Sequence, residues 1–232
     1  SIDQTIMFTD FQDSIFDYLT LNLKKLSKLE SENKNEIRDI LSEIYILKHK
    51  IQDCIFGPLD DVLLYYDNVK SKLKDYFDYN KNFLNNDEYD LLNKLIINLE
   101  DINLNNQSLF EPRREELKKM FTDELSVFKK FNTTIISDNP KMQIYYKKNL
   151  KEKWGLDIDI NTTQSPKKAY KYAIVPSEFS KERISKIINE YRFKNINFFT
   201  TPTIKEKIND VIKFNKSRWR KYFMEPSQKI KI

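Results

Sequence analysis

An apolar stripe with a seven-residue repeat runs through residues 59–83 and constrains the fold more than any other feature of the chain. Asn80 occupies the one position of this stripe that is not apolar, and the other members are Leu59, Val62, Tyr66, Val69, Leu73, Tyr76 and Phe83. Seven residues return a helical side chain to the same side of a helix, so the spacing is typical of coiled-coil seams. The stripe predicts a long helix that needs a partner, with these seven residues at the interface.

The preceding and following segments also have helical spacing. Residues 3–55 carry two apolar stripes separated by a polar stretch at 27–36, which fits either one long helix or a break between two. Pro58 suits the first turn of the next helix, because its missing N–H is not needed there. Residues 85–87 shift the register of the stripe, Pro112 opens a further helix that we extend to Phe131, and Gly155 is placed to end a shorter one.

The last third of the chain has a different pattern. Residues 171–175 and 196–200 fit short strands, and each is followed by a helical pattern. Residues 156–168 have no clear period and fit a linker. We therefore predict a mainly α protein, with an elongated helical bundle or coiled coil over residues 1–155, a linker over 156–168, and a small helical or α/β region over 169–232.

The composition speaks against an enzyme. The chain has 232 residues with one histidine, one cysteine and 2 glycines. One histidine, His49, allows no Ser-His-Asp arrangement and no histidine-rich metal site, and no glycine-rich phosphate loop is present. We expect no catalytic residues, no cofactor and no metal. Cys54 lies on an apolar stripe and is expected to be a small core residue.

The cysteine content and the hydropathy also indicate where the protein works. A single cysteine forms no disulfide within the chain and favours a reducing, intracellular compartment, either cytoplasmic or at the periphery of a membrane. No apolar run approaches the roughly 20 residues that a membrane-spanning helix needs.

Basic residues supply the remaining functional candidates, although a solvated surface explains each group equally simply. The net charge of +5 permits contact with an anionic surface. The candidates for contact with an anionic membrane are Lys70, Lys72, Lys74, Lys81, Lys129 and Lys130. A second group mixes cations with aromatic rings, a combination that can grip single-stranded nucleic acid: Lys216, Arg218, Trp219, Arg220, Lys221 and Tyr222.

Several short motifs in residues 58–131 resemble the middle of a BAR domain of the amphiphysin type. They are Pro58-Leu59, Asp78-Tyr79-Asn80-Lys81, Leu109-Phe110-Glu111 and Asp123-Glu124-Leu125. The resemblance implies a dimer of bent three-helix coils whose lysines bind curved anionic membrane. In this chain the lysines that would make this contact are Lys70, Lys72, Lys74 and Lys81. The chain departs from that pattern at the breaks near residues 85 and 112, in a third helix that is too short, and in residues 156–232, which have no counterpart.

These observations lead to one main functional hypothesis and two alternatives. The main hypothesis is a non-enzymatic, dimeric helical module that binds anionic membrane, a protein partner or both. The first alternative is a structural scaffold or adaptor subunit that forms homo- or hetero-oligomers through its seams and binds no lipid. The second is nucleic-acid binding through the basic and aromatic C-terminal group, which ranks lower because the net charge is modest.

Overall fold

We analysed a computed structural model of the chain, which describes residues 4–12, 14–29, 34–163, 170–190 and 193–224. The chain divides into two compact units. One unit combines Ser1–Phe11 with Asp123–Ile232, and the other is Gln12–Thr122. The second unit is therefore an insertion between the first strand of the first unit and the rest of it.

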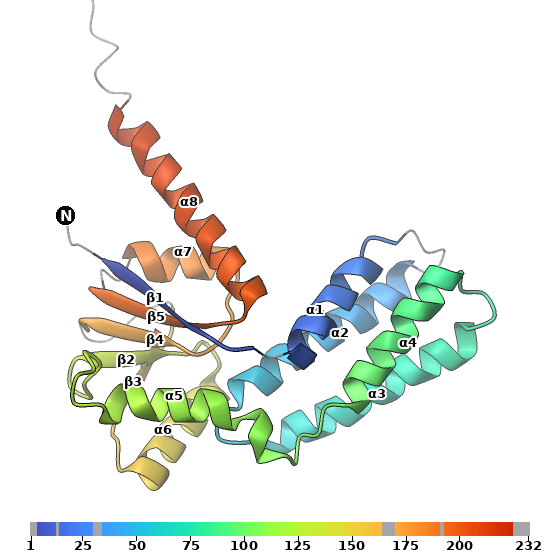
Figure 1. The fold of residues 1–232 in the computed structure, drawn as a ribbon, viewed down its shortest axis with the longest axis horizontal. Helices are drawn as coiled ribbons and strands as arrows, with labels where there is room; N and C mark the ends of the chain where they lie inside the picture. The colour runs from blue at the N-terminus through green and yellow to red at the C-terminus, as the bar shows by residue number, and fades with distance from the viewer. Residues whose placement is uncertain (1–3, 13, 30–33, 164–169, 191–192, 225–232) are drawn as a thin grey trace, which may run out of the picture. The chain divides into compact units, whose positions relative to one another are not determined.

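The first unit is built on a parallel sheet of five strands (Figure 1). The strands are β1 (Thr5–Asp10), β2 (Thr133–Ile136), β3 (Asp159–Asn161), β4 (Tyr172–Val175) and β5 (Asn195–Thr200). Their order across the sheet is β1-β5-β4-β2-β3, and every neighbouring pair is parallel. The helices of this unit are α6 (Pro140–Trp154), α7 (Lys181–Glu190) and α8 (Pro202–Met224).

The parallel sheet overturns the predicted fold class. The expectation of an elongated helical bundle, a coiled coil or a BAR-like architecture is wrong, and the chain is an α/β protein. β1 lies in a segment that we expected to be helical, β2 follows directly on another, and β3 lies inside the expected linker. Strands of a parallel sheet are short and covered on both faces, so their apolar runs cannot be told from buried helix by periodicity alone.

The core of the sheet unit lies between one face of the sheet and the helices α7 and α8. Alternate strand residues face this side, as the period of two requires, and include Ala173, Val175, Ile196 and Phe198. The helices contribute Ile184, Ile187, Ile204, Ile208 and Val211 to the same cluster. The ribbon in Figure 1 shows α6 on the opposite side of the sheet from α7 and α8.

The second unit is entirely helical where the structure describes it. Its elements are α1 (Ser14–Leu26), α2 (Lys34–Asp53), α3 (Asp60–Asn80), α4 (Asn86–Glu100), a 3-10 turn η1 (Gln107–Leu109) and α5 (Glu111–Thr122). A turn follows α1 at residues 27–29, so the first apolar stripes belong to two helices. The Asn85 side chain accepts a hydrogen bond from the backbone N–H of Glu88, whose own side chain bonds back to Asn85. This capping box begins α4 and explains the register shift at residues 85–87.

The seven-residue stripe is covered inside the helical unit. Val62, Tyr66, Val69, Leu73 and Tyr76 are all buried, and α3 packs against both α2 and α4. Leu59 is half-buried just before α3, whereas Phe83 follows the helix and is 83% exposed. Packing between antiparallel helices of one chain uses the same ridges and grooves as a coiled coil, so the repeat does not require a second molecule.

Among the helices that the structure describes, none combines the length and apolar character that crossing a membrane requires.

Candidate functional site

The candidate site lies at the carboxyl ends of β2 and β4, where the direction of the sheet's winding reverses. From β2 the chain passes through α6 to β3 at one edge of the sheet, whereas from β4 it passes through α7 to β5 in the other direction. β2 and β4 are direct neighbours, and α6 and α7 lie on opposite faces (Figure 1). In open parallel sheets such a switch point leaves room outside the strand ends, where ligands bind.

Asp138 is the central side chain of this site. It follows β2 directly, and its carboxylate accepts two hydrogen bonds from Thr163, which follows β3. The backbone N–H of Thr163 lies 2.6 Å from Oδ1 of Asp138, and the Thr163 hydroxyl lies 2.7 Å from Oδ2. Thr163 is buried, with 2% exposed. The pair therefore fixes the segment after β3 against the segment after β2.

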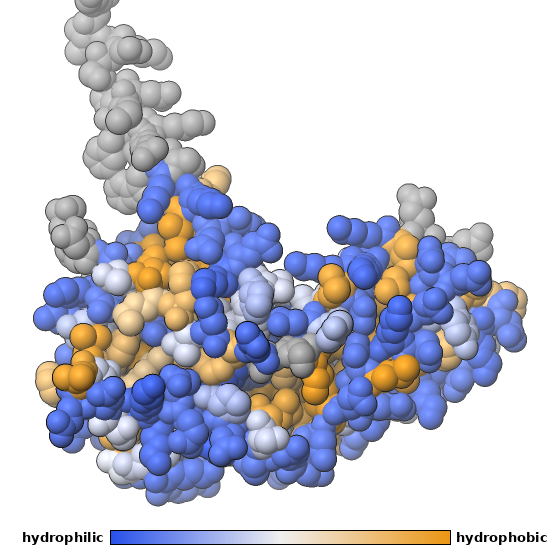
Figure 2. Space-filling model, in the orientation of Figure 1, coloured by the Kyte–Doolittle hydropathy of each residue, from blue (hydrophilic) through white to orange (hydrophobic). Residues whose placement is uncertain are grey.

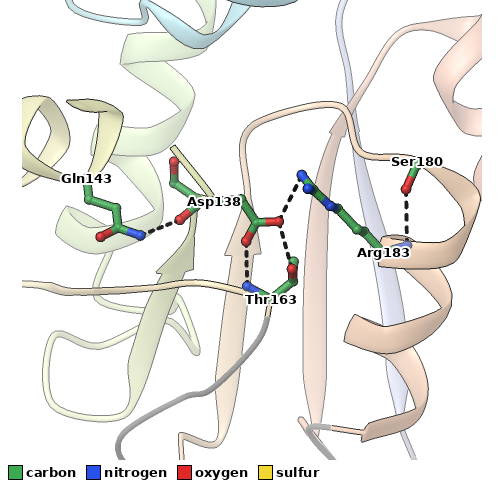
Figure 3. Close-up of polar contacts among 6 residues, drawn as sticks. Asp138, Gln143, Thr163, Ser180 and Arg183 are labelled. Atoms are coloured by element: carbon green, nitrogen blue, oxygen red, sulfur yellow. Dashed lines mark hydrogen bonds and ion pairs between the residues drawn. The ribbon is translucent and has the colours of Figure 1, made fainter. Parts of the chain in front are cut away.

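Arg183 reaches the same carboxylate from the other side of the switch point. Its Nη1 atom lies 3.0 Å from Oδ2 of Asp138, and its side chain is 52% exposed, compared with 15% for Asp138. Figure 3 shows the guanidinium extending from α7 toward Asp138 and Thr163. The segments after β2 and β3 and the first turn of α7 thus meet at one carboxylate, which is the relationship that defines the site.

Local sequence explains how these side chains are positioned. The Asn139 side chain accepts hydrogen bonds from the N–H groups of Lys141 and Met142, and Pro140 occupies the start of the helix, so α6 begins immediately after Asp138. The Gln143 side chain donates a 2.7 Å hydrogen bond to the carbonyl of Ser137 and holds the end of β2 to α6. At α7 the Ser180 hydroxyl accepts from the N–H of Arg183 at 3.3 Å.

The arrangement is suited to holding a small anion. A guanidinium has five N–H donors in a planar fork, and Asp138 contacts Arg183 through Nη1. The Arg183 side chain is 52% exposed, and α7 begins two residues before it, so the helix dipole also favours negative charge nearby. Asp138, with its hydrogen bonds already made, orients the guanidinium and is not itself aimed at a ligand.

A second polar cluster lies where β1 and β5 end. The Asp10 carboxylate accepts hydrogen bonds from the Lys205 ammonium at 2.6 Å and from the Thr200 hydroxyl at 2.7 Å. The bond from Lys205, followed by that from Thr200, holds the pKa of Asp10 below its usual value. β1 and β2 are three strand positions apart, about 14 Å at the usual strand spacing. The two carboxylates therefore do not converge on one atom.

Most of the lysines expected at a membrane lie on the helical unit and have local partners. Lys72 makes an ion pair with Glu43 at 2.8 Å, Lys81 pairs with Asp78 at 3.3 Å, and Lys70 lies over the ring of Tyr66. Lys74 is exposed on α3. Lys129 and Lys130 belong to the sheet unit and precede β2, so the six candidates do not form a single group.

The basic and aromatic candidates fall on α8. Lys216 is exposed. Arg218, Trp219, Arg220, Lys221 and Tyr222 lie within the helix, but their side chains lie outside the part that the structure describes.

The residues expected to be chemically inert lie within the helical unit. Cys54 is fully buried, and burial raises the pKa of its thiol to about 12. His49 lies on α2 with its ring edge-on to Tyr45 at 4.4 Å between centroids. No three histidine, cysteine or acidic side chains come together as a metal site within the described residues.

Sequence reasoning missed Asp138, Thr163 and Arg183. They are separated by 25 and 20 residues along the chain, and only the strand order brings them together. Two signals were present: Ser137-Asp138 and Pro176-Ser177 each follow a short apolar run. Polar residues directly after buried strands mark the carboxyl edge of a parallel sheet, where ligands bind. Finding them required that residues 133–136 be identified as a strand.

Comparison with known proteins assigns no family to this chain. No protein-family model matches it, and no curated protein matches it either. The resemblance to BAR domains stays a prediction from short motifs, and the bent helical coil that it implied differs from the observed α/β fold.

Proposed function

We propose that the sheet unit binds a small ligand through its phosphate or carboxylate group at the Asp138–Thr163–Arg183 cluster. The observation that carries this proposal is the position of Arg183, which is held by Asp138 at the switch point of the sheet and still exposes more than half of its side chain. Arginine forks match the geometry of phosphate and carboxylate oxygens. A carboxylate that fixes the fork in advance lowers the entropy cost of binding.

The surrounding charges favour the same class of ligand. Asp138 is the one acid in the cluster, and its charge is compensated by Arg183 and by two hydrogen bonds from Thr163. α7 begins at Lys181, two residues before Arg183, and the first-turn N–H groups of helices are common partners of phosphate oxygens. A cationic or wholly apolar ligand would find no matching group on Arg183.

The proposal replaces the membrane-binding helical module as the best-supported function. That hypothesis depended on an uncovered seam, whereas Val62, Tyr66, Val69, Leu73 and Tyr76 are buried within one unit. We propose binding without a chemical step, because Asp138 serves to orient Arg183 and the Asp10 cluster lies too far away to act on the same group.

Calorimetric titration of the full chain with pyrophosphate, AMP and citrate tests the proposal. At least one of these anions should bind, and Arg183→Gln should weaken that binding by tenfold or more, since a charge-assisted hydrogen bond is worth about 1.5–3 kcal/mol. Lys118→Gln is the matched control, because Lys118 is an exposed cation on α5 in the other unit. Binding that is unaffected by Arg183→Gln, or equally weakened by both substitutions, would contradict the proposal.

A further inference from the structure

The amino ends of the strands form the edge of the sheet opposite the Arg183 site. The loop that leads into β2 at this edge exposes large apolar side chains. Residues 123–132 connect to the amino end of β2. Leu125 is 92% exposed, Phe131 is 71% exposed and Val127 is 41% exposed. Figure 2 shows apolar side chains gathered at the left-hand side of the molecule, where Figure 1 has the segment that leads into β2. Three large exposed apolar residues within seven positions are unusual on a surface that stays in water.

Hydrogen bonds hold this loop in one shape. The Lys129 ammonium donates to the carbonyls of Asp123 and Glu124, both at 3.1 Å, and so closes the loop across its base. The Asp123 carboxylate accepts from the N–H of Leu125 at 2.9 Å. The Asn132 side chain accepts from the N–H of Lys129 at 3.1 Å. Leu125 and Phe131 are therefore exposed by a defined backbone geometry.

One aromatic residue anchors the loop to the sheet. Phe128 is 3% exposed, and its ring packs against Tyr172 with 5.9 Å between the ring centroids. Within four residues the loop thus buries one phenylalanine and exposes another. Phe128 occupies the buried position against Tyr172, and Phe131 is left exposed to a surface outside the loop.

Lysines follow one another along the same edge of the sheet. The N–H of Lys171 donates to the carbonyl of Asn132, the N–H of Lys194 donates to the carbonyl of Lys171, and the N–H of Thr5 donates to the carbonyl of Lys194. These bonds place Lys171 and Lys194 at the amino ends of adjacent strands, about 4.8 Å apart along the edge. Lys130, in the loop, completes the row, and all three lysines are exposed.

Acidic residues at this edge lie in two places. Asp123 and Glu124 are exposed at the start of the loop. Asp157 and Asp159 lie at β3, the outermost strand beyond β2. Asp159 accepts a hydrogen bond from the Tyr170 hydroxyl at 2.5 Å. Lys130, Lys171 and Lys194 themselves extend from the loop before β2 to the amino ends of β4 and β5.

We propose that this edge docks on an anionic membrane surface, with Leu125, Val127 and Phe131 entering the interface and Lys130, Lys171 and Lys194 contacting lipid phosphates. Transfer of apolar side chains from water to the lipid interface is favourable. Each lysine near an anionic leaflet increases the affinity about fivefold. The carboxyl ends of the strands, with the Arg183 site, lie at the other edge of the sheet. Membrane docking would therefore leave that site open, and the two proposals are independent.

Co-sedimentation with vesicles tests this docking surface in the full chain. We expect binding to vesicles of phosphatidylcholine with phosphatidylserine, and much weaker binding to phosphatidylcholine alone. The double variant Leu125→Ser/Phe131→Ser and the triple variant Lys130→Gln/Lys171→Gln/Lys194→Gln should each weaken binding at least tenfold. The five substituted side chains are exposed, so circular dichroism should show an unchanged melting temperature.

Two matched controls make the same chemical changes on the helical unit. Leu64→Ser/Phe83→Ser removes a leucine and a phenylalanine that are 64% and 83% exposed. Lys74→Gln/Lys94→Gln/Lys118→Gln removes three exposed lysines. Both should bind like the native chain. The proposal is overturned if the native protein does not bind the anionic vesicles, or if the controls lose as much vesicle binding as the test variants. It is also overturned if the triple lysine variant loses binding to a single-stranded RNA oligonucleotide and keeps its binding to the vesicles.

Discussion

Nη1 of Arg183 lies 3.0 Å from Oδ2 of Asp138. Asp138 leads into α6 and Arg183 lies on α7, and these two helices cover opposite faces of the sheet (Figure 1). The same carboxylate accepts both hydrogen bonds from Thr163. The contact therefore joins the segments that follow β2, β3 and β4, and it positions the guanidinium of Arg183 at the switch point of the sheet.

The two halves of this contact should differ in strength. Arg183 is half exposed, so its ion pair with Asp138 should couple by no more than about 1 kcal/mol. The bonds between Asp138 and the buried Thr163 should couple by more, because a buried polar group left without a partner costs about 1–3 kcal/mol. Double-mutant cycles in urea, with Asp138→Ala combined with Arg183→Ala or with Thr163→Val, measure both couplings. We assign Thr163 as the structural partner of Asp138 and Arg183 as the ligand-binding partner. A larger coupling energy of Asp138 with Arg183 than with Thr163 would contradict this assignment.

Tyr66→Phe should destabilise the helical unit by about 1–3 kcal/mol. The Tyr66 hydroxyl lies 2.5 Å from the carbonyl of Leu99, in the last turn of α4, and 3.0 Å from that of Ile102, just after the helix. Phenylalanine removes the hydroxyl donor from both carbonyls and keeps the ring packing, and the carbonyl of Leu99 still accepts from the N–H of Ile102 at 3.3 Å. Urea unfolding gives the free-energy change, and Tyr79→Phe, at a side chain 81% exposed, should change stability by less than about 0.5 kcal/mol. Equal effects of the two substitutions would contradict the structural role of Tyr66.

Cys54 should be unreactive in the folded protein. Burial raises the pKa of its thiol to about 12, so only about one molecule in ten thousand carries the reactive thiolate at pH 8. An aromatic disulfide reagent should therefore label the native chain very slowly and the urea-unfolded chain at once. Rapid labelling without denaturant would show that residues around Cys54 open readily.

Asp10 should contribute to stability only when it is ionised. Its folded pKa lies below the ordinary value of 3.8 because of Lys205 and Thr200. A depressed carboxyl pKa contributes stability that is present above the unfolded value and is lost as pH falls through the folded value. At pH 7 the free energy of unfolding of the native protein should exceed that of Asp10→Asn by up to about 1 kcal/mol, since the ion pair of Asp10 with Lys205 is largely exposed. This difference in stability should shrink below pH 3.8. A difference that grows as pH falls would contradict this sign.

The parts of the fold that were predictable from sequence carry strong local signals. Gly155 ends α6 with a φ of 65°, in the left-handed region that glycine favours. The strand expected at 171–175 and the one at 196–200 correspond to β4 and β5, and the helix after Pro202 is α8. In each case the signal lies within the element or directly beside it.

The features that sequence missed depend on contacts between distant segments. β1 pairs with β5, nearly 190 residues away, and its partner strand is what distinguishes Thr5–Asp10 from the start of a helix. The stripe on α3 has the same spacing whether it packs on α2 and α4 or on another molecule. Sequence patterns predict that an apolar face is covered, but they do not identify what covers it.

The central claim is tested most directly by nuclear magnetic resonance on the ¹⁵N-labelled full chain during titration with pyrophosphate. We expect saturable shifts of the Arg183 Nε–H resonance and of the backbone N–H groups of Lys181 and Glu182. Arg183→Gln should weaken the binding reported by the two backbone groups at least tenfold, and Lys118→Gln should preserve it. Shifts confined to other basic surfaces, or shifts at α7 that persist without the guanidinium, would contradict the central claim.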